Sequence, residues 1–179
     1  MTEAVAVQSK KDKAEENLPW NFAVSLWDEI FVMFGISLVS RETVMPVLVA
    51  SLTDSKLAIG LIPAIFSLGM YLPQLLVANF SERMRYKKGF IVLVSGAGER
   101  SAYLLMALAI WLLAESAPTL TLVLFFTFLA LAAGSIGIAM PAWFDMIAKV
   151  IPPQRRGLLF GSGRGLGALL GVVGALLVG

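Results

Sequence analysis

The sequence predicts an all-α polytopic membrane protein with five transmembrane helices, and three observations support this. Of the 179 residues, 58% are hydrophobic, and the mean hydropathy is +0.83. Only 15% of the residues are charged, against about 25% in a soluble domain. Five segments are apolar over about 20 residues each, the length that crosses a bilayer. A soluble protein of this composition would lack the polar residues that cover a water-facing surface, so the lipid bilayer is the expected environment.

The first 20 residues are polar and of mixed charge. They lack the basic-then-apolar order of a secretory signal. We expect residues 1–20 to form a cytoplasmic tail that ends at Pro19-Trp20, and residues 21–179 to form the transmembrane bundle.

The first span is predicted at residues 22–51, although Arg41 and Glu42 interrupt its apolar sequence FGISLVSRETVMPVLV. If these two charges lay in a loop, the flanking apolar runs 30–40 and 43–52 would each be only about half a span. Neither run could then cross the bilayer alone.

A shorter first helix that ends before Arg41 would be centred on Asp28 and Glu29, so charge enters the membrane in either case. A single long helix, tilted and bent at Pro46, uses the whole apolar run. We therefore expect Arg41 and Glu42 inside the first helix, in its outer third.

The remaining helices are predicted from apolar runs bounded by turn residues and charges. The third carries Glu99 and Arg100 at its centre, and the fifth carries Arg164 in its first half. The four predicted ranges are 57–80, 89–114, 119–143 and 157–179.

The basic residues indicate the orientation, because short cytoplasmic loops carry an excess of Lys and Arg. Only Lys56 lies in a loop on the opposite side. The N-terminus is therefore expected in the cytoplasm and the protein in the cell (inner) membrane. The chain stops as the fifth helix finishes, so we expect a truncation before helix six. The basic residues of the cytoplasmic side are Lys10, Lys11, Lys13, Arg83, Arg85, Lys87, Lys88, Lys149, Arg155 and Arg156.

Charged residues inside a membrane are costly, and they mark functional sites by default. We expect Asp28 and Glu42 to handle a proton or cation, and Arg41 and Arg164 to suit an anionic group on a substrate. At ~1.5 Å per residue, Arg164 lies about 10 Å from the cytoplasmic side, where a carboxylate of the first helix could pair with it. The alternative is that these charges pair with one another and only hold the bundle together.

Three predicted helices each carry one polar stripe, which suggests a bundle around a hydrated centre. Adjacent residues of a helix face different directions, whereas residues three, four or seven apart share a face. The three stripes are Asp28, Gly35 and Glu42; Ser67, Tyr71 and Gln74; and Ser95, Glu99 and Tyr103.

The fifth helix repeats glycine every four residues at Gly163, Gly167 and Gly171. Such a face lets another helix approach closely. It is interpreted either as packing inside the bundle or as a docking surface for a partner. Gly134, Gly137 and Pro141 make the fourth helix similarly able to pack closely and to bend.

The loop ANFSERMRYKKGF resembles the G-x-L-A-D-R-x-G-R-R/K pattern that joins helices two and three in the major facilitator superfamily of transporters. Glu82 stands for the Asp of that pattern, Arg83 for its Arg and Lys87 for its last basic residue, while Arg85 replaces the second Gly. The stretch MIAKVIPPQRRGLLFG is similar to the family's loop before helix five. The likeness covers most of residues 21–179.

The resemblance implies a partial N-terminal six-helix bundle of a secondary active transporter that moves a small-molecule substrate by alternating access. The missing C-terminal half would come from the same or a separate chain. Glu82 and Arg83 would belong to a cytoplasmic gate, and Glu99 and Arg100 to a more structural position. The resemblance favours four residues as cavity candidates: Arg41, Glu42, Gln74 and Arg164.

The chain has no Cys and no His, which removes thiolate and imidazole chemistry and most zinc sites. We expect no metal, no cofactor, no nucleic-acid partner and no enzymatic activity. The alternative function is a stand-alone five-helix scaffold or partner subunit that uses the glycine face of its fifth helix for docking.

Overall fold

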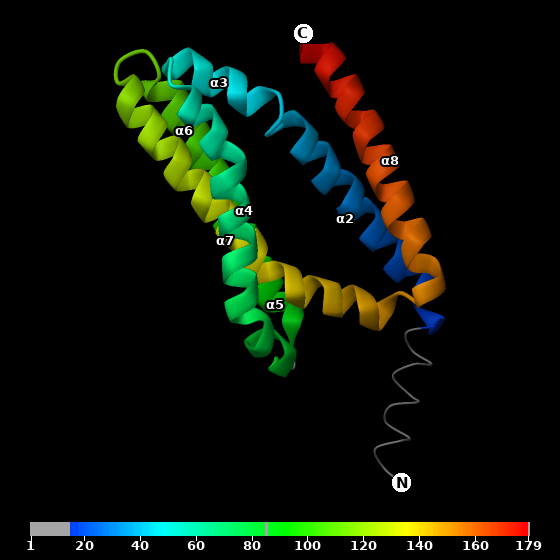
Figure 1. Cartoon of the computed structure of the whole chain (residues 1–179). Helices are drawn as coiled ribbons and strands as arrows, with labels where there is room; N and C mark the ends of the chain where they lie inside the picture. Colours follow the sequence, from blue (N-terminus) through cyan, green and yellow to red (C-terminus); the bar gives the residue numbers. More distant parts are fainter. Residues whose placement is uncertain (1–14, 85, 179) are drawn as a thin grey trace. The chain divides into compact units, whose positions relative to one another are not determined.

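The computed structural model describes residues 15–84 and 86–178, with side chains throughout except at 81–83 and 177–178. The described residues form helices joined by short connections (Figure 1). The chain divides into two compact units. Unit 1 comprises Met1–Ser40 together with Met146–Gly179, and unit 2 comprises Arg41–Asp145. The predicted tail boundary at residue 20 falls within the first turn of the first described long helix, and residues 1–14 lie outside the described part.

Five helical segments are long and apolar enough to cross a membrane, as the sequence predicts. Even the shortest, with 21 residues, is about 31 Å long at 1.5 Å per residue, which matches a hydrocarbon core of about 30 Å. An all-helical chain with the segments of a multi-pass membrane protein is therefore confirmed for the described residues. The segments are Leu18–Leu38, Lys56–Phe80, Lys87–Leu113, Pro118–Val150 and Pro153–Leu176.

The outer surfaces of these helices are apolar. Large side chains such as Trp111, Leu75 and Leu176 are among the most exposed residues, at 78% or more. In water such surfaces would promote association. On helices of this length they are suited to contact with lipid.

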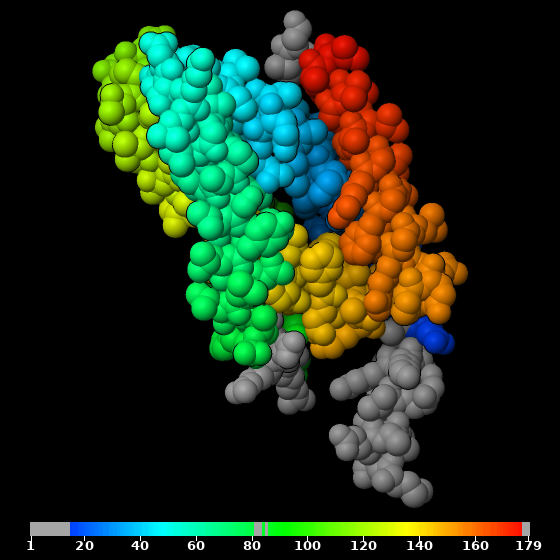
Figure 2. All heavy atoms as spheres, viewed as in Figure 1, coloured from blue at the N-terminus to red at the C-terminus, as the bar shows by residue number. Residues whose placement is uncertain are grey.

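Unit 1 consists mainly of α2 (Leu18–Leu38) and α8 (Pro153–Val178), which run side by side (Figure 1). Figure 2 shows α8, in orange to red, lying against α2, in blue. The last turn of α7 belongs to the same unit. Arg156 closes this turn, because its Nε donates to the carbonyl of Ile151 at 3.0 Å and its Nη2 to that of Ala148 at 2.9 Å. These carbonyls lie at a helix end, where partners within the helix run out.

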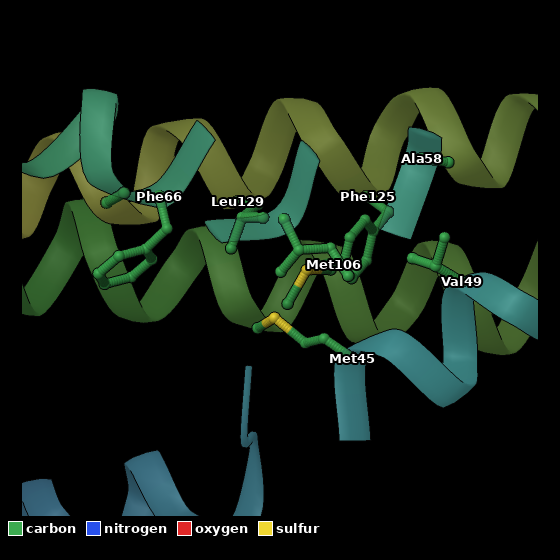
Figure 3. Packing of buried hydrophobic residues seen from close by; sticks show 9 residues of the cluster. Met45, Val49, Ala58, Phe66, Met106, Phe125 and Leu129 are labelled. Atoms are coloured by element: carbon green, nitrogen blue, oxygen red, sulfur yellow. The ribbon is translucent and has the colours of Figure 1, made fainter. Parts of the chain in front are cut away.

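Unit 2 packs the remaining helices around one apolar core. Met45, Met106, Phe125 and Leu129 meet between the helices in Figure 3, and each is at most 5% exposed. The elements are α3 (Val44–Leu52), α4 (Lys56–Arg83), α5 (Lys87–Ile91), η1 (Val92–Glu99), α6 (Arg100–Leu113) and α7 (Pro118–Val150) as far as Asp145.

Glycines bring α4 and α7 close together inside unit 2. A Cβ added at Gly69 would lie 2.8 Å from the Cβ of Ala133, and one added at Gly137 would overlap the backbone of Met70. Close approach of backbones is the usual role of small residues between membrane helices. The predicted close packing of the fourth helix is therefore confirmed at Gly137.

Prolines begin several helices because the first turn needs no backbone N–H from them. Pro118 opens α7 and Pro153 opens α8, while Pro19 occupies the first turn of α2. In α3, Pro46 is the third residue.

The prediction of one continuous first helix over 22–51 is wrong. Helix α2 ends at Leu38, residues 39–43 are not helical, and α3 begins at Val44. The break lies just before Pro46, which cannot donate a hydrogen bond to the carbonyl four residues earlier and so favours a helix start, although α4 continues through Pro63 and Pro73. A helix that restarts at Val44 places this proline in its first turn, where the missing donor costs nothing.

The predicted third helix, 89–114, forms as three consecutive pieces rather than as one regular α-helix. Its middle, Val92–Glu99, is a π-helix that contains Ser95, Gly96 and Gly98. π-Helical turns are rare in proteins, and those that occur are frequently found at functional sites.

The other boundaries differ at their polar ends. Helix α4 reaches Arg83 rather than residue 80, α8 begins at Pro153 rather than residue 157, and α7 runs on to Val150 rather than stopping at residue 143. The predicted range of the fourth helix covers only its uncharged run, whereas the helix continues through Asp145 and Lys149. The residue before a proline is disfavoured in a helix, and α7 accordingly ends just before Pro152.

Candidate functional site

The clearest candidate site is an ion pair between the two long helices of unit 1. Arg164 Nε on α8 donates a hydrogen bond to Glu29 Oε1 on α2 at 3.3 Å. Each residue lies eleven positions after its helix begins, or about 16 Å at 1.5 Å per residue. The pair is therefore near the middle of both candidate spans rather than about 10 Å from one side. A charge at that depth is costly unless it is paired or hydrated.

The two partners differ strongly in exposure. The Glu29 side chain is 7% exposed and the Arg164 side chain 67%. The Arg164 guanidinium also lies 5.9 Å from the ring centroid of Phe160, at the outer limit of a cation–π contact. The expected pairing of Arg164 with a first-helix carboxylate is observed, and the carboxylate is Glu29.

Glycines on α8 make room for this pair. A Cβ added at Gly163 would lie 2.5 Å from Cγ and 2.8 Å from Cβ of Glu29. Further along, a Cβ at Gly167 would lie 2.5 Å from Met33 Cβ, and one at Gly171 would overlap Ser37. The glycine face is therefore a packing surface for α2, the first of the two interpretations that the sequence left open.

Asp28 does not join the pair. It is exposed on α2, whereas its neighbour Glu29 is buried, because adjacent residues of a helix point about 100° apart. The predicted stripe of Asp28, Gly35 and Glu42 is not continuous. Helix α2 ends between Gly35 and Glu42, so the seven-residue repeat no longer places them on one face.

Arg41 and Glu42 lie in the connection between α2 and α3 rather than inside a helix. Within unit 2, the Arg41 guanidinium carbon is 3.9 Å from the ring centroid of Phe66 on α4, a close cation–π contact. Glu42 is exposed. Since Leu18–Leu38 is a candidate span by itself, both charges follow the span, and their predicted place within its outer third is wrong.

A second polar cluster lies within unit 2 near the π-helix. Ser95 donates a hydrogen bond to Glu99 Oε2 at 2.7 Å. Tyr103 follows one turn further on and is partly buried. The structure thus shows Ser95 and Glu99 of the predicted stripe in contact, whereas Arg100 is exposed.

The remaining predicted site residues lie on α4. Gln74 is partly buried and follows Pro73 inside the helix. Glu82 and Arg83 belong to the last turn of α4, but their side chains lie outside the described part, so the predicted gate stays a prediction.

The sequence reasoning missed an ion pair in unit 2. Lys87 Nζ at the start of α5 lies 2.7 Å from Asp145 Oδ2 on α7, as an ion pair rather than an aligned hydrogen bond. The Lys87 side chain is only 6% exposed, and that of Asp145 is 38% exposed. The available signal was the lone acid of the fourth helix, which the predicted boundary at residue 143 placed in a loop.

The sequence predicts Glu29 as an intramembrane charge and Asp28 as the functional carboxylate. The spacing of Leu26, Ile30, Met33 and Ser37 would have corrected this choice. These residues recur every three or four positions. Side-chain atoms of Leu26, Met33 and Ser37 face the glycines of α8, and Ile30 faces them with its backbone carbonyl oxygen. Glu29 lies on that same face.

The described residues contain no group of three or more acidic side chains that could hold a metal ion. The two side chains of the ion pair are a carboxylate, which can accept a proton, and a guanidinium, which can bind an anion. No known protein family, curated protein or solved structure matches this chain.

Proposed function

We propose that this chain is the N-terminal part of a secondary active transporter of the major facilitator type, which moves a small solute across a membrane by alternating access. The observation that carries the proposal is the Glu29–Arg164 pair in the middle of two candidate spans. Ionisable residues at such depth are rare and mark substrate or ion pathways and proton relays. A pair that is buried on one side and open on the other suits that role.

Further charge within the spans of unit 2 supports the proposal. Glu99 and Arg100 lie at the middle of the segment Lys87–Leu113, and Glu99 accepts a hydrogen bond from Ser95. A purely structural bundle gains little from ionisable groups, because removing them from water costs more than their attraction usually returns.

The order of the loops and their basic residues supports the family assignment. A transporter of this type has two helical halves. The proposal therefore includes a C-terminal half, in the same or a separate chain, as well as a cytoplasmic N-terminus in a cell (inner) membrane.

The alternative, a five-helix scaffold, loses the docking surface from which it was inferred. The glycines at 163, 167 and 171 face α2 within unit 1. A scaffold would have to use another surface.

Two measurements test the proposal. The intact mass of the polypeptide in its native membrane should be at least about twice the 19.2 kDa of this chain, or a separate second half should copurify with it. A lone 19.2 kDa species without a partner contradicts the proposal.

Solute flux into proteoliposomes should then depend on the ion pair. Arg164→Gln is expected to reduce flux roughly tenfold or more, as loss of a charged hydrogen bond would. Glu42→Gln is the comparison, because Glu42 lies in the connection after α2. If Glu42→Gln strongly reduced solute flux and Arg164→Gln did not, the residues of the connection between α2 and α3, rather than the ion pair, would carry the transport function.

A further inference from the structure

We infer that the solute carries an anionic group that binds Arg164, and that Glu29 takes up a proton when this group binds. The inference rests on the proposed function and deepens it, because it names the substrate class and the coupling ion. It is carried by the contact, burial and depth of the ion pair.

Arg164 has donors to spare. Its contact with Glu29 uses Nε, whereas a guanidinium offers five N–H groups in a planar fork. With 67% of the side chain exposed, the edge formed by the two terminal nitrogens can face an incoming oxyanion. Carboxylates and phosphates are the groups that this edge binds with two parallel hydrogen bonds.

The neutral glycines beside Arg164 leave its exposed side open. A Cβ added at Gly161 or Gly165 would meet no atom within 4 Å among the described residues. By contrast, a Cβ at Gly163 would overlap Glu29. Glu29 thus closes one side of Arg164, the Phe160 ring lies 5.9 Å from its guanidinium, and the backbone positions of Gly161 and Gly165 beside it are uncrowded.

Charge balance favours uptake of a proton by the buried partner, Glu29. At the middle of a span, the resting pair of one carboxylate and one guanidinium is neutral overall. An anion added to this pair would leave one uncompensated negative charge in a medium where such a charge is costly. If Glu29 takes up a hydronium proton from the solution and leaves a water molecule behind, the site holds a neutral carboxyl group, the guanidinium and the anion, and its net charge is again zero.

Glu29 is the only described carboxylate in the contact with Arg164, and it is the buried one. Asp28 is exposed on another face of α2. Arg156 is engaged with the carbonyls at the end of α7. The other described ionisable residues of unit 1 lie at or near helix ends and not at mid-span: Glu15, Glu16, Lys149 and Arg155.

The test measures anion binding and proton uptake together. The intact native protein in phosphatidylcholine nanodiscs is titrated in weak buffer near neutral pH, with a pH indicator. Sodium acetate probes for a carboxylate substrate and sodium sulfate for a phosphate-type substrate, each adjusted to the starting pH. We expect about one proton to be taken up per acetate bound in the wild type and in Asp28→Asn.

Two variants separate the roles of the pair. Glu29→Gln should bind the anion without proton uptake, and Arg164→Gln should bind roughly tenfold or more weakly. Anion binding without proton uptake in the wild type, uptake that persists in Glu29→Gln, or no binding of either probe would each overturn the inference.

Two charge-neutral variants test the position of Glu29 rather than its charge. A Cβ at Gly163 would lie 2.5 Å from Cγ and 2.8 Å from Cβ of Glu29, so Gly163→Ala must move Glu29 relative to Arg164, whereas a Cβ at Gly161 meets no atom within 4 Å. Gly163→Ala should therefore lower the number of protons taken up per anion, and Gly161→Ala should match the wild type. Equal values for the two variants contradict the inference.

Flux assays distinguish this inference from the proposed function. Proton-linked anion binding without any solute flux would refute the proposed transport function but support the inferred binding site. Solute flux that is unchanged in Glu29→Gln would support transport but refute the inferred role of Glu29.

Discussion

Replacing Gly167 with alanine tests how closely α2 and α8 must approach. A Cβ at this position would lie 2.5 Å from Met33 Cβ and 2.8 Å from the carbonyl oxygen of Ile30. Carbon atoms in contact are normally about 3.5–4.0 Å apart, so the two helices would have to separate by roughly 1 Å. Because one of the obstructing atoms is backbone, rotation of a side chain cannot relieve the overlap.

We expect Gly167→Ala to lower the free energy of unfolding by about 1–3 kcal/mol, the usual cost of overpacking. The matched control is Gly165→Ala on the same helix, where a Cβ meets no atom within 4 Å. There alanine brings mainly its better helix propensity, which favours folding by about 0.5–1 kcal/mol. The two variants should therefore shift stability in opposite directions.

The assay is equilibrium unfolding of the full chain in lipid bicelles, induced by SDS and followed by circular dichroism. Proteolysis of the connection at residues 39–43 can report the same separation locally. If Gly167→Ala and Gly165→Ala unfold with the same free energy, the close contact between α2 and α8 is not the one described.

Three further predictions concern other contacts. Asp145→Asn should destabilise the protein by up to about 3–5 kcal/mol, and more than Lys87→Met does, because it leaves a buried ammonium unpaired; equal losses in chemical unfolding would contradict this. Arg156→Gln removes two hydrogen bonds from the end of α7 and should cost about 1–3 kcal/mol, seen as faster hydrogen exchange of the last turn; unchanged exchange would show that the turn does not need its cap. A double-mutant cycle of Arg41→Gln and Phe66→Leu should give a coupling energy of about 0.5–2 kcal/mol in unfolding experiments, and a coupling near zero would rule out the cation–π contact as a stabilising interaction.

The sequence predicts the helical spans well, because a run of about 20 apolar residues is a direct requirement of the bilayer. All five candidate spans lie where apolar runs were found. The ends of α4, α7 and α8 were misplaced because charged residues can continue a helix beyond the hydrocarbon core. Composition marks the membrane boundary, and backbone hydrogen bonds decide where the helix ends.

The first helix shows what composition cannot decide. Both a continuous helix and a break at Arg41 bring charge into the span, and the sequence reasoning chose the continuous one. The structure places Pro46 in the first turn of α3, where its missing N–H costs nothing, whereas Pro63 and Pro73 lie inside α4, so a proline in the sequence does not by itself locate a helix end. Once α2 ends at Leu38, its middle falls on Asp28 and Glu29.

The choice between those two carboxylates depends on the direction in which each side chain points around the helix axis. Position along the helix gives depth in the membrane but not this direction. Glu29 shares the face that packs against glycines of α8, and Asp28 does not. The Lys87–Asp145 pair was beyond reach for a related reason. It joins positions 58 residues apart, and no local pattern indicates that they meet.

The short helix α3 has a consequence for how the chain is assembled in the membrane. With nine residues, it is too short to be inserted as a span by itself. Its buried residues Met45 and Val49 belong to a cluster with Met106 and Phe125, which are synthesised much later. Docking of α3 must therefore wait until the fourth span has emerged from the ribosome. A nascent chain arrested before residue 100 should leave a cysteine placed at Val49 open to thiol reagents, and the full chain released from the ribosome should protect it.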